Sequence, residues 1–350
     1  MSVSATTTCF DEDENHGLIV SMAEEMNPSR RCTMEDVCIH YGPEFFRING
    51  RGPSLPSSPK KKRSRSSFEA HADVGLRYKQ QNWHMLGVYD GHGGRDIVEY
   101  LEHNLGRIVK EELHSDDEDD QNSSVLERME RALLLADVDS YQKGIHASGA
   151  TVVISLICLD PILRKDRDAV CRRRCRIFTA NCGDARAVLS RGRNDSTRIS
   201  FDHKADDTKE IQRIEDAGGF VLKGRVLGVL AVARSMGDHL LKEYVTARPF
   251  LHETQIEYEV PYPDFCDNDR PQPFIILACD GLWDVVSDDE AVSMVQHCIS
   301  TFEQKSSRGK SKQDLSKIRQ IANAASKILT KEGLKRGSTD NISVVVALFR

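Results

Sequence analysis

Strand-like apolar runs follow one another along this 350-residue chain, and helical patterns come in pairs. TVVISLICL, RIFTANC and RAVLS form such a group of strands at residues 151–159, 176–182 and 186–190. Apolar residues recur at helical spacing over 96–113 and again over 125–136. This grouping favours an α+β fold, in which helix pairs cover antiparallel sheets, over the βαβ alternation of a parallel sheet.

Shorter signals extend the same pattern along the chain. Asp207 and Glu210 have capping-box spacing, and Gly218 follows as a helix stop. Further helices are predicted at 287–299 and 315–329. Further strands are predicted at GLIVSM (17–22), CTMEDVCIHY (32–41), HMLGVY (84–89), FIILACD (274–280) and ISVVVALF (342–349).

Two segments lack an apolar period. Residues 1–16 are polar and acidic, which predicts a disordered tail. Residues from about 43 to 78 are rich in proline, serine and basic side chains, which predicts a flexible loop insertion. The predicted domain therefore spans 17–350 and carries this insertion.

Composition excludes several classes of protein. The net charge of −6 argues against a general nucleic-acid binder. The N-terminus has no signal-peptide pattern, and the longest apolar run, at 152–159, is too short to cross a bilayer. The 10 cysteines occur singly, and the pair Cys171 and Cys175 has no partner ligands nearby for zinc. We expect free thiols in a reducing compartment.

Acidic residues stand beside the apolar runs in five separate segments. The segments contain Glu35 and Asp36, Asp90, Asp184, Asp280 with Asp284, and Asp340 with Asn341. A carboxylate near a core is costly unless a cation or hydrogen bonds compensate it. Any one of these acids could be a turn residue or a helix cap. Taken together they favour a shared site for hard divalent cations, magnesium or manganese, over a zinc site.

Eight motifs in order resemble the type 2C (PPM) metal-dependent serine/threonine protein phosphatases, especially the small fungal-type members. They run from about Gly17 to Phe349 and read RRCTMED, YDGHGG, SGATVV, ANCGDARAVL, DHKADD, RVLGVLAVARSMGD, ACDGLWDV and GSTDNISVVV. The resemblance implies a four-layer αββα sandwich with a two-metal site at one end between the sheets.

The resemblance also implies a ligand set and a mechanism. Two magnesium or manganese ions are expected, with a weaker third as an alternative, and a hydroxide bridging the two ions attacks phosphorus. By motif the ligands are Glu35, Asp90, the Gly91 carbonyl, Asp280 and Asp340. By the same motifs Asp36, Asp184, Asp284 and Asn341 hold metal-bound waters or the third ion.

Two further residues acquire roles from this resemblance. Arg31 is expected to hold the phosphate in bidentate fashion, and His92 to protonate the leaving oxygen. By chemistry alone Arg30 is an equal candidate to Arg31, and His92 could simply be a residue at a helix N-terminus. His203 is a second histidine candidate, for which a structural role is favoured.

The chain departs from the family pattern at two positions. Leu227 stands where the family usually has asparagine, and Ala185 where it usually has serine. Neither is a metal ligand, and no loss of activity follows. The basic run at 59–65 resembles a nuclear import signal formed by Lys60, Lys61, Lys62, Arg63 and Arg65. A solvated charge run or a substrate-docking patch are the alternatives.

The favoured function is a protein phosphatase that acts on phosphoserine and phosphothreonine in proteins, with stress-activated protein kinases as expected substrates. A monomer in nucleus and cytoplasm is expected, without nucleic-acid or membrane partners. One alternative is a non-catalytic pseudophosphatase that binds a signalling partner, but the acidic set is complete. Another is a two-metal nuclease, against which the lack of a basic face outside one loop argues.

Overall fold

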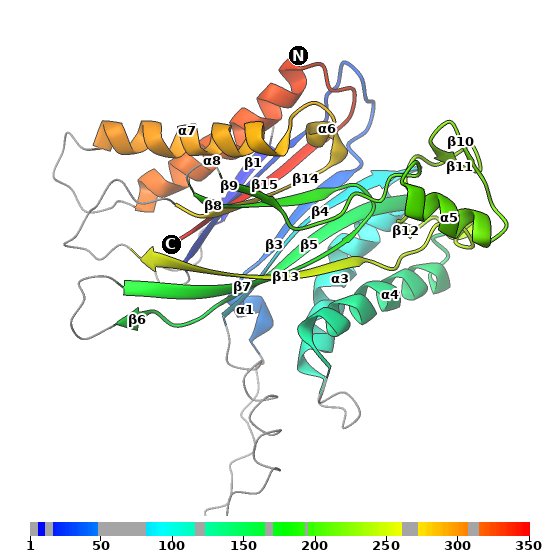
Figure 1. Cartoon of the computed structure of the whole chain (residues 1–350), viewed down its shortest axis with the longest axis horizontal. Coiled ribbons are helices and arrows are strands. Elements are labelled where there is room, and N and C mark those ends of the chain that lie inside the picture. The colour runs from blue at the N-terminus through cyan, green and yellow to red at the C-terminus, as the bar shows by residue number, and fades with distance from the viewer. Residues whose placement is uncertain are drawn as a thin grey trace, which may run out of the picture.

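The computed structural model describes residues 6–10, 17–47, 82–115, 123–164, 171–192, 195–260, 272–306 and 315–350. Two antiparallel sheets lie face to face, and a pair of helices covers the outer face of each sheet (Figure 1). The predicted α+β fold, a four-layer αββα sandwich, is confirmed.

All strand pairs in the two sheets are antiparallel. The first sheet has the order β1 (Thr6–Phe10), β2 (Leu18–Glu25), β15 (Ile342–Phe349), β14 (Phe274–Ala278), β8 (Arg186–Gly192) and β9 (Asp195–Arg198). The second has the order β13 (Phe250–Val260), β7 (Cys171–Cys182), β5 (Gly149–Leu159), β4 (Asn82–His92) and β3 (Asp36–Tyr41). Short strands β12 (Met236–Gly237) and β6 (Leu163–Arg164) pair with β5 and β7.

The helices divide between the two outer faces. Helices α7 (Asp288–Ser306) and α8 (Leu315–Lys335) pack on the first sheet, and α3 (Asp96–His114) and α4 (Val125–Gln142) pack on the second. A small lobe near one end holds α5 (Thr208–Asp216) and the hairpin of β10 (Val221–Leu222) and β11 (Arg225–Val226) (Figure 1). The described residues also form the short helices α1 (Pro43–Phe46) and α6 (Asp280–Trp283) and the 3₁₀ helix η2 (His239–Leu241).

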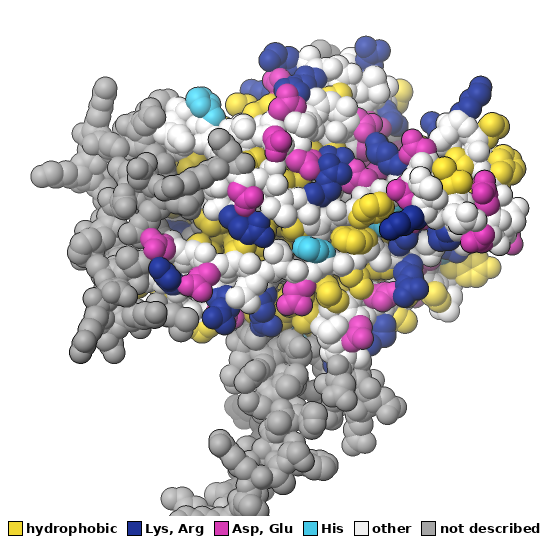
Figure 2. All heavy atoms as spheres, viewed as in Figure 1, with side chains coloured by type: hydrophobic (Ala, Val, Ile, Leu, Met, Phe, Trp, Pro, Cys, Tyr) yellow, Lys and Arg dark blue, Asp and Glu magenta, His cyan; other side chains and the backbone are white. Residues whose placement is uncertain are grey.

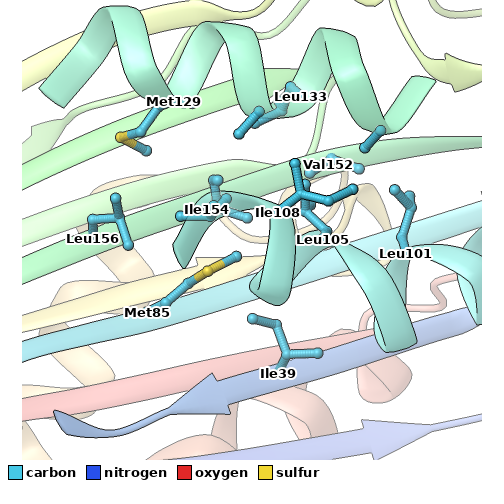
Figure 3. Close-up of a cluster of buried hydrophobic side chains, with 14 of the residues drawn as sticks. Ile39, Met85, Leu101, Leu105, Ile108, Met129, Leu133, Val152, Ile154 and Leu156 are labelled. Carbon is cyan, nitrogen blue, oxygen red and sulfur yellow. The ribbon is translucent and has the colours of Figure 1, made fainter. Parts of the chain in front are cut away.

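Apolar side chains form three layers, one between the sheets and one under each helix pair. In the layer under α3 and α4, helix residues such as Leu105 and Leu133 meet strand residues such as Met85 and Ile154 (Figure 3). The predicted faces of 96–113 and 125–136 are buried as expected. Burial of these faces is the main favourable free-energy term that fixes the helices to the sheet.

The structure corrects four predictions. Thr6–Phe10 is a strand and not part of a disordered tail; the rest of 1–16 lies outside the described residues. Pro43–Phe46 is a helix with Phe46 buried, so the predicted insertion does not begin at 43. Strand β3 begins at Asp36, which leaves Glu35 just before it. Strand β13 was not predicted; six of its eleven residues are polar, and most of the eleven are half-buried or exposed.

The described surface carries charges of both signs. On the face shown in Figure 2, lysine and arginine side chains are interspersed with aspartate and glutamate. Within the described residues, no helix is long and apolar enough to cross a membrane. Eight cysteines of the described residues, Cys171 and Cys175 among them, are free thiols.

Candidate active site

The ends of β3 and β4 place two carboxylates side by side. Asp36 and Asp90 are register partners on these adjacent strands. The chain continues through Gly91, whose N–H donates to the Glu35 carbonyl oxygen at 3.2 Å. A Cβ atom on Gly91 would lie 2.6 Å from that same oxygen and 2.6 Å from Val98. Position 91 is therefore restricted to glycine by the close approach of the segment that carries Glu35.

The opposite sheet supplies the remaining acids. Asp280 is the first residue of α6 after β14, and Asp340 stands just before β15. Gly281 allows the segments that carry Asp280 and Asp340 to pack closely. A Cβ at position 281 would lie 1.8 Å from the Asn341 carbonyl oxygen. Asp184 follows β7. The structure thus brings the five acidic segments to one end of the sandwich, between the sheets.

The pKa values show how little positive charge compensates these acids. Burial, together with the neighbouring carboxylates, raises the pKa of Asp36 to about 7 and of Asp280 to about 8. The pKa of Asp90 is raised well above its usual range for the same reasons. Burial raises the pKa of Asp184 to about 6, although Lys204 acts in the opposite direction.

Two oxygens of this acidic cluster have no hydrogen-bond partner among the described residues. They are Oδ2 of Asp36 and Oδ1 of Asp280, both buried. An unpaired carboxylate oxygen that is held out of water is costly unless a cation neutralises it. All-oxygen donors of this kind suit magnesium or manganese. The residues therefore fit the divalent ions that the sequence predicts.

Ion pairs occupy part of the acidic cluster. Arg31 Nη2 is paired with Asp340 Oδ2, and Arg31 Nε donates to the Thr339 carbonyl oxygen at 3.3 Å. Glu35 Oε1 accepts a hydrogen bond from the Thr33 hydroxyl at 3.2 Å. No three acidic, histidine or cysteine side chains of the described residues are arranged to hold an ion together. A cation bound at Asp340 would therefore compete with Arg31 for Oδ2.

Two of the predicted outer residues, Asp284 and Asn341, have definite partners. Asp284 is exposed and accepts from Lys204 Nζ at 2.9 Å. Asn341 is buried, and its amide bonds the N–H of Glu35 at 2.9 Å and the carbonyl oxygens of Met26 and Thr33 at 2.8 and 3.0 Å. These bonds fix the side chain of Asn341, and its expected role in holding a metal-bound water stays a prediction.

The two candidate histidines, His92 and His203, have different surroundings. His92 ends β4, and its Nε2 lies 2.7 Å from Oδ2 of Asp238. His203 is buried, and its Nδ1 lies 3.1 Å from the Gly183 carbonyl oxygen. Burial lowers the pKa of His203 to about 4, which suits the predicted structural role. The sequence prediction missed Asp238, although it stands in the SMGD motif.

The two departures from the family pattern lie in different parts of the fold, Leu227 in the small lobe and Ala185 between the sheets. Leu227 follows β11 with φ of 49°, in the left-handed region that asparagine tolerates better than leucine. Ala185 is fully buried between the sheets. The basic residues Lys60, Lys61, Lys62, Arg63 and Arg65 lie outside the described residues.

Comparisons with known proteins identify the family of this chain. The sequence model of the family "Protein phosphatase 2C" matches residues 55–342. The chain belongs to the protein phosphatase 2C family. It is therefore a serine/threonine protein phosphatase, as its motifs predict, in a family that generally depends on magnesium or manganese.

Relatives in yeast and plants cover most of this phosphatase. "Protein phosphatase 2C homolog 1" of Saccharomyces cerevisiae is 31% identical over 287 residues, which are 81% of this chain and 89% of that protein. "Probable protein phosphatase 2C 45" of rice is 36% identical and covers 76% of each chain. The crystal structure of a phosphatase from Toxoplasma gondii has a TM-score of 0.63 at 20% identity, covering 99% of this chain and 96% of that one. This last likeness supports the fold.

Proposed function

We propose that this phosphatase hydrolyses phosphoserine and phosphothreonine in proteins at the acidic end of the sandwich, with divalent ions as cofactors. The observation that carries the proposal is the convergence of Asp36, Asp90 and Asp280, all with raised pKa values, and the unpaired oxygens of Asp36 and Asp280. When bound, two divalent ions would activate water as the nucleophile. Glu35, Asp90, the Gly91 carbonyl, Asp280 and Asp340 are the residues proposed to hold them.

Arg31 is proposed to bind the phosphate. Its side chain is half-exposed and reaches the acidic cluster at Asp340. A guanidinium can bind two phosphate oxygens at once, whereas an ammonium group acts as a point charge. Neighbouring Arg30 supplies a matched control. We expect Arg31→Ala to raise KM for a phosphopeptide much more than Arg30→Ala does, and Arg31→Lys to restore little.

His92 is proposed to give a proton to the leaving serine or threonine oxygen. An alkoxide leaves poorly without a proton, so general acid catalysis contributes about 10²–10⁴-fold to such a reaction. The side chain is partly exposed at the end of β4, next to Asp90 and Gly91. It can therefore reach a phosphoester that is bound at the acidic cluster.

The test is phosphate release from a phosphothreonine peptide with manganese, with EDTA, and with Asp280→Asn. We expect activity that needs metal and falls at least about 10²-fold in the variant. Asp139→Asn is the control, because Asp139 bonds Tyr100 and Lys143 on the outer helices. A folded wild type that releases no phosphate with manganese would favour the pseudophosphatase instead.

The basic run at 59–65 and the family resemblance lead to two further proposals, on location and on substrate. We propose that Lys60, Lys61, Lys62, Arg63 and Arg65 direct import into the nucleus, on the strength of their sequence pattern. Replacing the three lysines with alanine should move a fluorescent fusion to the cytoplasm. Stress-activated kinases are proposed as substrates from the family resemblance, which loss of phosphothreonine from a phosphorylated kinase of that class would test.

A further inference from the structure

Asp238 and His92 lie on opposite sides of a glycine. His92 on β4 is the register partner of Gly149 on β5, and Gly149 in turn pairs with Gly237 on β12. A Cβ on Gly149 would come within 2.0 Å of Asp238 Oδ2 and 2.3 Å of His92 Nε2. Strand β5 therefore has no side chain at position 149, and the side chains of Asp238 and His92 contact each other in that space.

The direction of the hydrogen bond follows from the chemistry of the two groups. An ionised carboxylate can only accept, so the 2.7 Å contact requires the proton on His92 Nε2. Nδ1 is then the ring nitrogen that faces a leaving oxygen, and it can give that oxygen a proton when the ring is doubly protonated. Asp238 is nearly buried, with 7% of its side chain exposed, whereas His92 is 29% exposed. The buried carboxylate is thus fixed, and the histidine reaches toward solvent.

Several bonds hold Asp238 in place. Its backbone is left-handed, with φ of 49°, and its N–H donates to the Ser148 carbonyl oxygen at 3.0 Å. The Ser235 hydroxyl donates to the same carboxylate oxygen that meets His92. A left-handed aspartate that is not in a simple turn carries strain that its surroundings must offset. Strain of this kind is often retained where a side chain must point in one direction.

Helix α4 anchors the segment that carries Asp238. Asp137 Oδ1 accepts from the Gly237 N–H at 2.8 Å and from Lys242 Nζ at 3.0 Å. These bonds secure the chain on both sides of Asp238 to a helix in the outer layer. The carboxylate therefore has a rigid support that does not involve the acidic cluster.

We propose that Asp238 is the positioning residue for His92: it accepts the Nε2 proton, so that the doubly protonated ring gives its Nδ1 proton to the leaving oxygen and keeps the one on Nε2. This inference rests on the proposed function, in which His92 protonates that oxygen. Asp238 itself contacts neither the phosphate-binding Arg31 nor the proposed metal ligands through any bond that the structure shows for the described residues. It acts through the orientation of the ring.

The test compares two substrates that differ in the proton demand of the leaving group. Asp238→Ala should lower kcat for a phosphothreonine peptide about 100-fold, with little change in KM. It should lower kcat for p-nitrophenyl phosphate less than about fivefold, because nitrophenolate leaves without a proton. Asp238→Asn, which keeps an acceptor oxygen, should lie between Asp238→Ala and the wild type on the peptide. Asp139→Asn is the control and should change neither substrate by more than about twofold.

A double variant and metal binding separate positioning from general damage. If Asp238 acts through His92, the variant with both residues replaced by alanine is no slower than His92→Ala. Manganese affinity and the melting temperature of Asp238→Asn should stay close to those of the wild type. Equal losses on both substrates, additive losses in the double variant, or lost manganese binding would each overturn the inference.

A spectroscopic readout keeps the inference independent of activity. In two-bond ¹H–¹⁵N spectra at a pH where the ring is neutral, His92 of the wild type should carry its proton on Nε2. In Asp238→Ala the ring should become a mixture of tautomers. A wild-type proton on Nδ1 would refute the positioning role. If the wild type releases no phosphate, the proposed function fails, and the spectrum alone decides the pairing of Asp238 with His92.

Discussion

Asp36 and Asp90 face each other as register partners on β3 and β4. Like charges directly opposite on neighbouring strands destabilise a sheet, and burial increases the effect. Nothing in the described residues donates to Asp36 Oδ2. The strands thus hold two acids together at a free-energy cost that a bound cation would offset.

We therefore predict that Asp36→Asn raises the free energy of unfolding of EDTA-treated protein by about 1 kcal/mol at pH 8. The new amide removes one charge and can donate to Asp90. Chemical denaturation in urea would measure the gain. Manganese should raise the melting temperature of the wild type more than that of Asp36→Asn. A loss of stability in the chelated variant, or an unchanged response to manganese, would contradict this explanation.

The acidic positions were predictable because their signal is local. An apolar run that stops at an aspartate marks the end of a strand, and antiparallel strands return to the same edge of the sandwich. Asp90 and Asp280 were found in this way from sequence alone. The helix faces of α3 and α4 were predicted for a similar reason, since a period of 3.6 residues is visible within one segment.

Contacts between distant segments could not be predicted from local patterns. Asp238 and His92 are 146 positions apart in the sequence. They are in contact because the two-residue strand β12 pairs with β5. Glu210 was expected to complete a capping box with Asp207, but its carboxylate instead pairs with Arg213 and Arg234. In each case tertiary partners decide the side-chain position.

Arg186 links three segments behind the acidic cluster, which leads to a second prediction. It pairs with Asp202 and with Asp288 at 2.7 Å, and its guanidinium lies 5.1 Å from the ring centre of Trp283. Arg186→Ala would leave two poorly exposed carboxylates without this partner, so we expect a loss of about 3 kcal/mol in unfolding free energy.

Arg191→Ala is the matched control for Arg186. Arg191 pairs with Asp195 at 3.2 Å, and both side chains are about 40% exposed. Its removal should cost less than about 1 kcal/mol. Urea unfolding of both variants under one set of conditions would decide, and similar losses would show that Arg186 has no special role.

The buried His203 leads to a prediction on pH. Burial lowers the pKa of His203 to about 4, below the usual 6.5 of an unfolded chain. Between these values the unfolded state binds the extra proton, so stability is full above pH 6.5 and is lost as the pH falls toward 4. His203 should contribute up to about 3 kcal/mol to this loss.

Two variants test whether His203 causes the loss of unfolding free energy at acid pH. His203→Gln should flatten the fall of unfolding free energy between pH 6.5 and 4, although His40, whose pKa burial also lowers to about 4, should leave part of it. Exposed His297 on α7 is the control, and His297→Gln should keep the wild-type slope. Equal slopes in the wild type and His203→Gln would reject the assignment.

Gly281 leads to the last prediction, because it lets α6 approach the end of the loop before β15. A Cβ at this position would lie 1.8 Å from the Asn341 carbonyl oxygen and 3.4 Å from Asp340 Cβ. Gly281→Ala should therefore destabilise the fold by about 3 kcal/mol and weaken manganese binding, since the backbone must move between Asp280 and Asp340. Gly144→Ala, at a left-handed position with open space around it, should cost about 1 kcal/mol and leave manganese binding unchanged. Urea unfolding and a manganese titration would measure both effects. Normal manganese affinity in Gly281→Ala would mean that the separation of the two acids does not govern metal binding.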